Sequence, residues 1–167
     1  MAKSKVQVLV IMGSASDREV MARCAAVLEE FGLAYEFTVG SAHRSPARVR
    51  KLAEEAAGRG VKVIVAAAGM AAHLAGVIAA HTELPVIGVP LISGDLKGMD
   101  ALLSTAQMPP GVPVACMGLG PAGAINAGHL AVRILALQDR GLARKIKAYK
   151  RKMVRQVEEA AAVLAKG

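Results

Sequence analysis

Two neighbouring residues, His43 and Arg44, combine side chains that can do acid/base chemistry and bind phosphate. An imidazole gains and loses a proton near neutral pH, and a planar guanidinium matches the oxygens of a phosphate group. Together they predict a loop that holds a phosphorylated ligand and places a proton-transfer group beside it. His73 stands in apolar sequence, where it is either a buried histidine with a hydrogen-bonded partner or a contact to the same ligand.

Residues 13–17 (GSASD) have the composition of a turn between a strand and a helix. Backbone N–H groups at the start of a helix, together with serine hydroxyls, suit a phosphate group. Asp17 would repel a phosphate, but its carboxylate can accept hydrogen bonds from ribose hydroxyls. An equally good interpretation is that Ser16 or Asp17 only caps the helix that follows.

Strands and helices alternate along the chain and must position these segments. Short apolar runs predict strands over residues 6–12, 35–39, 61–67, 86–89 and 112–117. Apolar residues at helical spacing predict helices over residues 17–31, 46–57, 71–80, 99–105 and 122–137. This alternation is typical of an α/β protein, and we expect a flavodoxin-like three-layer α/β/α sandwich with a five-stranded parallel sheet in the order 2-1-3-4-5. In that order the ligand site lies between strands one and three, next to residues 13–17, 40–46 and 69–73.

The 167 residues are expected to form a single domain, with an α/β core over residues 1–140 and a basic amphipathic helix over residues 141–167. The net charge is +8, and residues 140–155 contain eight basic side chains and no acidic one. Such a segment can bind RNA or anionic lipid. We favour another interpretation, in which the apolar stripe of this helix packs on a neighbouring subunit and its charges face water. The stripe consists of Leu142, Ile146, Tyr149, Met153 and Val157.

Several classes of protein and site are disfavoured by the sequence. Two cysteines are too few for a disulfide framework and fit a reducing cytoplasm, and four dispersed histidines argue against a metal site. Residues 118–123 (GLGPAG) match the dinucleotide fingerprint, but no further strand with a terminal acid follows them. The apolar residues 63–80 predict a strand, a turn and a helix rather than a membrane span, and residues 6–12 predict a strand rather than a signal peptide.

Four motifs together resemble the PurE family, in the order and spacing of that family over about residues 5–140. They are residues 12–17 (MGSASD), 41–46 (SAHRSP), 71–74 (AAHL) and 107–114 (QMPPGVPV). The family comprises N5-carboxyaminoimidazole ribonucleotide mutases of purine biosynthesis, also named as the catalytic subunit of phosphoribosylaminoimidazole carboxylase. The resemblance implies a homo-octamer with sites at subunit boundaries, no metal or cofactor, and a functional link to an ATP-dependent synthetase that makes the substrate.

The resemblance also implies roles for individual residues. His43 would be the general acid and base, and His73 would line the pocket for the base. The residues expected to bind the ribonucleotide substrate are Gly13, Ser14, Ser16, Asp17, Ser41, Ala42, Arg44, Gly69, Met70, Ala71, Ala72, His73 and Leu74. The chain departs from the mutase pattern at Met70, where glycine is usual, and at Ala75, where proline is usual.

Three functions remain open from the sequence. The first is a mutase that moves a carboxylate from the exocyclic nitrogen to C4 of the aminoimidazole ring. The second is a carboxylase that adds CO2 directly to aminoimidazole ribonucleotide, whose third motif generally lacks the AAHL run around His73. The third belongs to another class, a non-catalytic module that binds nucleotides or RNA. We expect the mutase, with no nucleic acid or membrane as partner.

Overall fold

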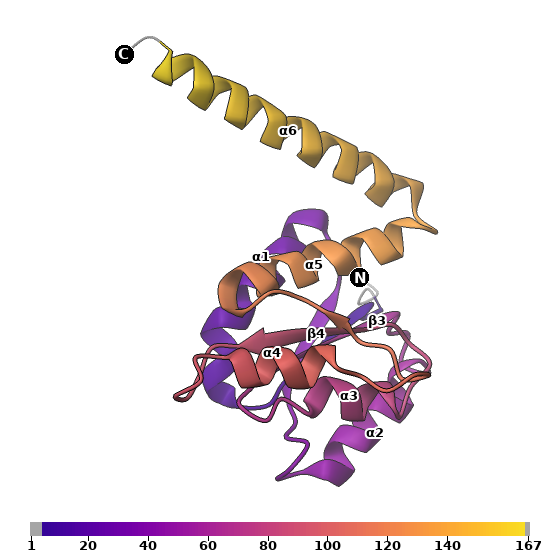
Figure 1. The fold of residues 1–167 in the computed structure, drawn as a ribbon. Helices are drawn as coiled ribbons and strands as arrows, with labels where there is room; N and C mark the ends of the chain where they lie inside the picture. Colours follow the sequence, from indigo (N-terminus) through magenta and orange to yellow (C-terminus); the bar gives the residue numbers. More distant parts are fainter. Residues whose placement is uncertain (1–4, 166–167) are drawn as a thin grey trace.

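A computed structural model describes residues 5–165 and places five parallel strands in one sheet with the order β2-β1-β3-β4-β5. Figure 1 shows this sheet between two layers of helices, with the last helix leading away from the body. The strands are β1 (Val8–Met12), β2 (Tyr35–Val39), β3 (Val63–Gly69), β4 (Val86–Leu91) and β5 (Ala115–Cys116). The predicted α/β architecture and strand order are therefore confirmed.

The helices divide between the two faces of the sheet. One face is covered by α1 (Arg18–Phe31) and α5 (Gly120–Ala136), and the other by α2 (Pro46–Ala56) and α3 (Leu74–Ala79). The helix α4 (Met99–Ala106) packs beside β4 and β5. The remaining helices are the short 3-10 turn η1 (Ala15–Asp17) and the long C-terminal α6 (Arg140–Leu164).

The central strands are apolar at nearly every position because both of their faces are buried. In β1, Val8 and Val10 belong to the cluster beneath α1 and α5, whereas Leu9 and Ile11 belong to the cluster beneath α2 and α3. Successive side chains of a strand point to opposite faces, so a strand covered on both sides has no position for an exposed polar group. Polar chemistry is therefore confined to the loops at the strand ends.

Two elements begin three residues later than the sequence predicts. The fifth strand was expected over residues 112–117, but only Ala115 and Cys116 pair with β4. Pro113 has no N–H group to donate to a ladder, which restricts pairing at this sheet edge. The third helix is expected from residue 71, but it begins at Leu74, because the N–H groups of Ala72 and His73 bond the carbonyls of Met70 and Ala71 in tight turns that an α-helix does not contain.

The helices α1 and α5 approach each other closely because α5 has small residues on the contacting side. A Cβ atom at Gly128 would lie 2.9 Å from Cβ of Val27 and 3.0 Å from the carbonyl oxygen of Cys24. Ala124, Ala127 and Ala131 on the same helix are fully buried. Part of the abundant alanine and glycine in the sequence therefore allows α1 and α5 to pack closely together.

The first part of α6 packs on its own subunit. Asp139 caps the helix by accepting hydrogen bonds from the N–H groups of Gly141 (2.7 Å) and Leu142 (3.1 Å). Leu142 is buried, and Ile146 and Tyr149 pack against the same core cluster. The expectation that the whole stripe packs on a neighbouring subunit is wrong for these three residues.

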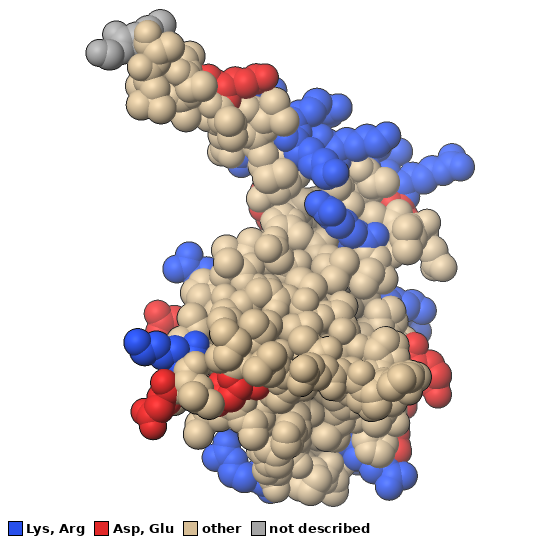
Figure 2. Space-filling view, in the orientation of Figure 1, with Lys and Arg blue, Asp and Glu red and all other residues tan. Residues whose placement is uncertain are grey.

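The second part of α6 has no such contact within the chain. Residues 151–164 are all exposed, and Figure 2 shows lysine and arginine side chains gathered along the first part of the helix. The predicted end of this helix at residue 167 lies outside the described residues. Among the helices of residues 5–165, none combines the length and the apolar character that crossing a membrane requires.

The close packing of α1 on α5 predicts that Gly128→Ala destabilises the protein. Alanine usually stabilises a helix by about 0.5–1 kcal/mol relative to glycine, but here the new methyl group meets backbone and side-chain atoms. We expect a net loss of about 1–3 kcal/mol in the free energy of unfolding, measured by urea denaturation. Gly58→Ala is the matched control, because its nearest neighbour would be 3.6 Å away, and a loss of equal size there would contradict the explanation.

Candidate active site

The loops that follow β1, β2 and β3 meet at the carboxyl edge of the sheet and line an open cavity of about 500 Å³. The expected catalytic residue His43 lines this cavity, and so do most of the residues expected to bind substrate: Gly13, Ser14, Ser16, Asp17, Ser41, Ala42, Arg44, Gly69, Met70, Ala71 and Leu74. The remaining two expected residues, Ala72 and His73, are not among the lining residues. The prediction that the three loops form one site at the switch point agrees with this geometry.

The first loop is stabilised by a reciprocal cap. The Oγ atom of Ser14 accepts a hydrogen bond from the N–H of Ser16, and the N–H of Ser14 donates to Oδ2 of Asp17 (3.1 Å). The Oγ atom of Ser16 also donates to Oγ of Ser14 (2.8 Å). Ser14 is thus the N-cap of η1, whereas Asp17 occupies the N-cap position of α1 and makes no side-chain capping bond there. The serine-to-acid spacing of three residues was the available signal for this capping box.

Asp17 is the acidic group of the cavity. Burial raises the pKa of its carboxyl, and the hydrogen bonds from Ser14 and Ser16 only partly oppose this effect. A partly buried carboxylate that already accepts bonds on one side is suited to neutral donors such as hydroxyl groups. This environment fits contact with a ribose better than contact with a phosphate.

The second loop is held in shape by its own serines and joined to the first loop by Arg44. The backbone N–H of Arg44 donates to Oγ of Ser41 (3.2 Å), and the N–H of Ser41 donates to Oγ of Ser45 (3.0 Å). Nη2 of Arg44 donates to the carbonyl oxygen of Gly13 (3.3 Å). The guanidinium therefore lies between two loops, with hydrogen atoms left to bind an anion in the cavity.

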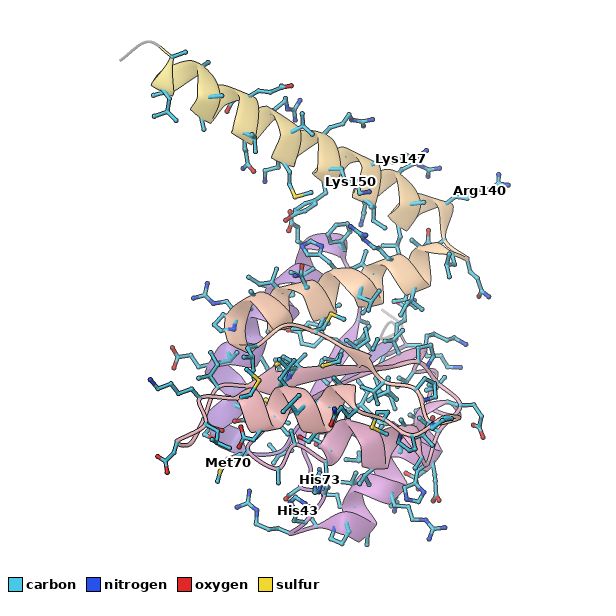
Figure 3. All side chains as sticks on the ribbon, viewed as in Figure 1. His43, Met70, His73, Arg140, Lys147 and Lys150 are labelled. Carbon is cyan, nitrogen blue, oxygen red and sulfur yellow. The ribbon has the colours of Figure 1, made fainter. Side chains whose placement is uncertain are left out.

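The third loop turns tightly before α3 begins. The N–H of Ala72 contacts the carbonyl of Met70 and also Oγ of Ser104 on α4 (3.2 Å). Ala72 is buried and is not among the residues that line the cavity. Met70 is 59% exposed, and its side chain projects from the rim of the site (Figure 3). A bulky residue at positive φ is conformationally costly, and such residues concentrate at functional sites.

The two histidines of the second and third loops contact each other directly. Nε2 of His43 lies 2.9 Å from Nδ1 of His73, and the two rings meet edge to face with centroids 5.0 Å apart. Figure 3 shows the two side chains side by side at the end of the molecule opposite α6. One of these nitrogens carries the shared hydrogen and the other accepts it, so His73 fixes the orientation of the His43 ring. The sequence placed both residues at one site but contained no sign of this contact.

Two other kinds of ligand considered from the sequence are a metal ion and a dinucleotide. Within residues 5–165, no cluster of three or more histidine, cysteine or acidic side chains is arranged to hold a metal ion. In residues 118–123, a Cβ atom at Gly123 would lie 1.7 Å from the carbonyl oxygen of Gly118, so the glycine permits a tight turn from β5 into α5. The chain then continues into α6 without the further strand that a dinucleotide fold requires.

Ala68 and Ser93 line the cavity although the sequence analysis did not select them. Ala68 belongs to β3, and Ser93 follows β4, the next strand in the sheet. The rule that loops after neighbouring parallel strands share one edge could have located Ser93, because β4 lies beside β3 in the predicted order.

A parallel sheet with a pair of imidazoles at its switch point, and serine and arginine donors suited to a phosphorylated small molecule, defines an α/β protein of the ligand-binding type. The family model for AIR carboxylase matches residues 7–156. The N5-carboxyaminoimidazole ribonucleotide mutase of Thermotoga maritima is 51% identical over 91% of this chain and 88% of the relative. The mutase of Bacillus subtilis is 56% identical over 82% of this chain and 85% of the relative.

A solved structure agrees with these sequence comparisons. The crystal structure of Treponema denticola PurE is 29% identical, with a TM-score of 0.82 over 92% of this chain and 94% of that one. The chain belongs to the AIR carboxylase family.

The bridging position of Arg44 predicts that Arg44→Lys weakens binding of aminoimidazole ribonucleotide about tenfold, because lysine cannot reach Gly13 and a phosphate with one planar group. Calorimetric titration of the variant measures the change. Arg48→Lys is the control, since Arg48 donates to Val39 and Thr38 outside the cavity. Equal weakening in both variants would contradict a specific role for Arg44.

Proposed function

We propose that the chain is an N5-carboxyaminoimidazole ribonucleotide mutase of purine biosynthesis, with His43 as its general acid and base. The observation that carries the proposal is the position of His43, held by His73 at the mouth of a cavity with phosphate-type donors. Curated relatives of that name are about 50% identical to the chain over most of both sequences. The other site residues act in binding: Ser14, Ser16, Ser41 and Arg44 on the phosphate, and Asp17 on the ribose.

The reaction needs one proton delivered and one proton removed. The bond between the exocyclic nitrogen and the carboxyl carbon breaks, CO2 leaves, and the nitrogen takes a proton. CO2 then forms a bond to C4 of the ring, and the hydrogen on C4 leaves as a proton. The substrate and product are isomers, so one imidazole that gives a proton in the first half and takes one in the second ends unchanged.

His73 is the positioning partner in this proposal. A neutral imidazole presents one donor and one acceptor, so the contact with His73 Nδ1 couples the hydrogen positions of the two rings. An imidazole nitrogen can donate or accept a hydrogen bond. His73 can therefore keep its contact with His43 when His43 gains or loses a proton. The small residues Gly69 and Ala71 in the cavity wall leave space for a flat ring beside this pair.

The mutase is favoured over direct carboxylation because curated relatives about 50% identical over most of the chain carry the mutase name. A nucleic-acid module is disfavoured because the basic residues of α6 lie away from the candidate site. Figure 3 shows Arg140, Lys147 and Lys150 near the start of α6, at the opposite end of the molecule from His43. A basic helix remote from the cavity cannot supply its phosphate contacts within one chain.

The replacement His43→Asn tests the catalytic proposal. We expect turnover of N5-carboxyaminoimidazole ribonucleotide to fall by about 10²–10⁴-fold, the usual contribution of a general acid or base. Binding of the nucleotide should change much less, because Arg44 and the serines remain. Turnover is measured by absorbance, and binding is measured by calorimetry. The turnover assay is run at low bicarbonate, because a carboxylase needs added CO2 and the mutase does not.

His81→Asn is the matched control for this experiment. His81 follows α3, where it approaches Glu54, and does not line the cavity. Full turnover is expected in the control. Substantial residual turnover in the His43 variant, or product formation by the unchanged protein only at high bicarbonate, would contradict the proposal.

A second copy of the chain is proposed to cover the site. Both His43 and His73 are exposed to solvent in a single chain, whereas a reaction through free CO2 needs a closed cavity. Beside the cavity, α4 and the loop before it expose the large apolar side chains of Ile92, Leu96, Met99 and Leu103. Figure 2 shows this face as largely free of charged side chains, which gather at its margin.

The proposed partner of this apolar face is an identical face or loop of another subunit, and the expected assembly is a homo-octamer. An apolar surface beside an incomplete site is typical of an interface that completes that site. The exposed end of α6 supplies a second contact of the same kind through Met153 and Val157. A cytoplasmic location and an ATP-dependent synthetase that supplies the substrate belong to the same proposal.

A charge on the apolar face should therefore reduce the assembly. We expect Leu103→Asp to lower the molar mass measured by light scattering and to lower turnover with it. Leu137→Asp is the control, because Leu137 is 84% exposed between α5 and α6, away from this face. A wild-type protein that is monomeric, or an unchanged mass in the Leu103 variant, would contradict the proposed interface.

A further inference from the structure

Ser93 is a cavity residue whose hydroxyl group has no partner. It follows β4 by two residues and lines the cavity together with Gly69 and Met70. Its Oγ atom is buried, and among the described residues it is the one buried side-chain nitrogen or oxygen without a hydrogen bond. A buried hydroxyl group that makes no bond lowers stability, so its presence calls for a partner that the free chain does not contain.

The backbone around Ser93 leaves space for this hydroxyl group. A Cβ atom at Gly69 would lie 2.2 Å from Oγ of Ser93, so only glycine fits opposite the serine in its present rotamer. No hydrogen bond holds Oγ in that rotamer. Rotation about the Cα–Cβ bond into another staggered position therefore breaks no bond in the protein.

The position of Ser93 in the sheet indicates which part of a nucleotide it meets. The phosphate and ribose donors follow β1 and β2, and Ser93 follows β4 on the other side of β3. Neighbouring strands lie about 4.8 Å apart, so the end of β4 is roughly 10 Å from the end of β1. A ribonucleotide with its phosphate at Arg44 would extend its base across β3 toward Ser93.

We propose that Ser93 is a substrate-binding residue that donates a hydrogen bond to the carboxylate on the aminoimidazole ring. The inference rests on the proposed mutase function, because that function places a carboxylate at the base end of the nucleotide. A serine hydroxyl supplies the one donor hydrogen that a carboxylate oxygen accepts, and the bond is strengthened by the negative charge. The free hydroxyl is thus kept unpaired for an acceptor that arrives with the substrate.

Calorimetric binding of two nucleotides to Ser93→Ala tests the proposal. One is 4-carboxy-5-aminoimidazole ribonucleotide, and the other is aminoimidazole ribonucleotide, which lacks the carboxylate. We expect about tenfold weaker binding of the carboxylated nucleotide and unchanged binding of the other. The melting temperature of the free variant should be equal to or higher than that of the wild type, because an unpaired buried hydroxyl has been removed.

The matched control is Thr82→Ala, which removes a hydroxyl that accepts a bond from the N–H of Leu84 outside the cavity. Its affinity for both nucleotides should equal that of the wild type. Equal weakening of both nucleotides by Ser93→Ala, no weakening of either, or a lower melting temperature would overturn the proposed contact. Failure of the wild type to bind either nucleotide would instead overturn the mutase proposal, and the role of Ser93 with it.

Discussion

The contact between His43 and His73 is the interaction on which the candidate site depends, because it joins loops from two strands that are not neighbours. These loops follow β2 and β3, and β1 lies between those strands in the sheet. The central strands are sealed by helices on both faces, so polar groups can emerge only at the strand ends. The register of the parallel sheet then brings the ends together, and the imidazole pair fixes how two of the loops meet.

Much of the fold could be predicted because its local and long-range preferences agree. Continuous apolar runs such as β1 and β3 are typical of strands buried on both faces, and the helices between them have a clear apolar face. The misplaced elements are those where backbone geometry competes with apolar pattern. Pro113 shortens β5 although its neighbours are apolar, and the tight turns that follow Met70 delay α3 by three residues. Nothing in the local sequence distinguishes these turns, or the left-handed Met70 before them, from the first turn of a helix.

The candidate site could be predicted to the level of its loops, whereas its internal bonds could not. Strand order alone placed residues 13–17, 40–46 and 69–73 at one edge, and the structure brings them around one cavity. The pairing of the two histidines depends on side-chain directions that no spacing in the sequence encodes. Ser93 escaped notice because a single serine in a loop forms no motif. The closed pocket expected from the chemistry is also not a property of one chain, because both histidines remain exposed.

The aromatic contact between α6 and the body has an optical consequence. The sequence contains no tryptophan and two tyrosines, Tyr35 and Tyr149. The Tyr149 ring lies 4.8 Å from the His129 ring and 5.8 Å from the Phe31 ring, centroid to centroid, while Tyr35 belongs to β2. Ultraviolet emission from this protein therefore comes from two phenol rings, one of them at the joint between the long helix and the core. Detachment of that helix changes the surroundings of Tyr149 and leaves those of Tyr35 intact, so the molecule contains its own fluorescent probe of this joint.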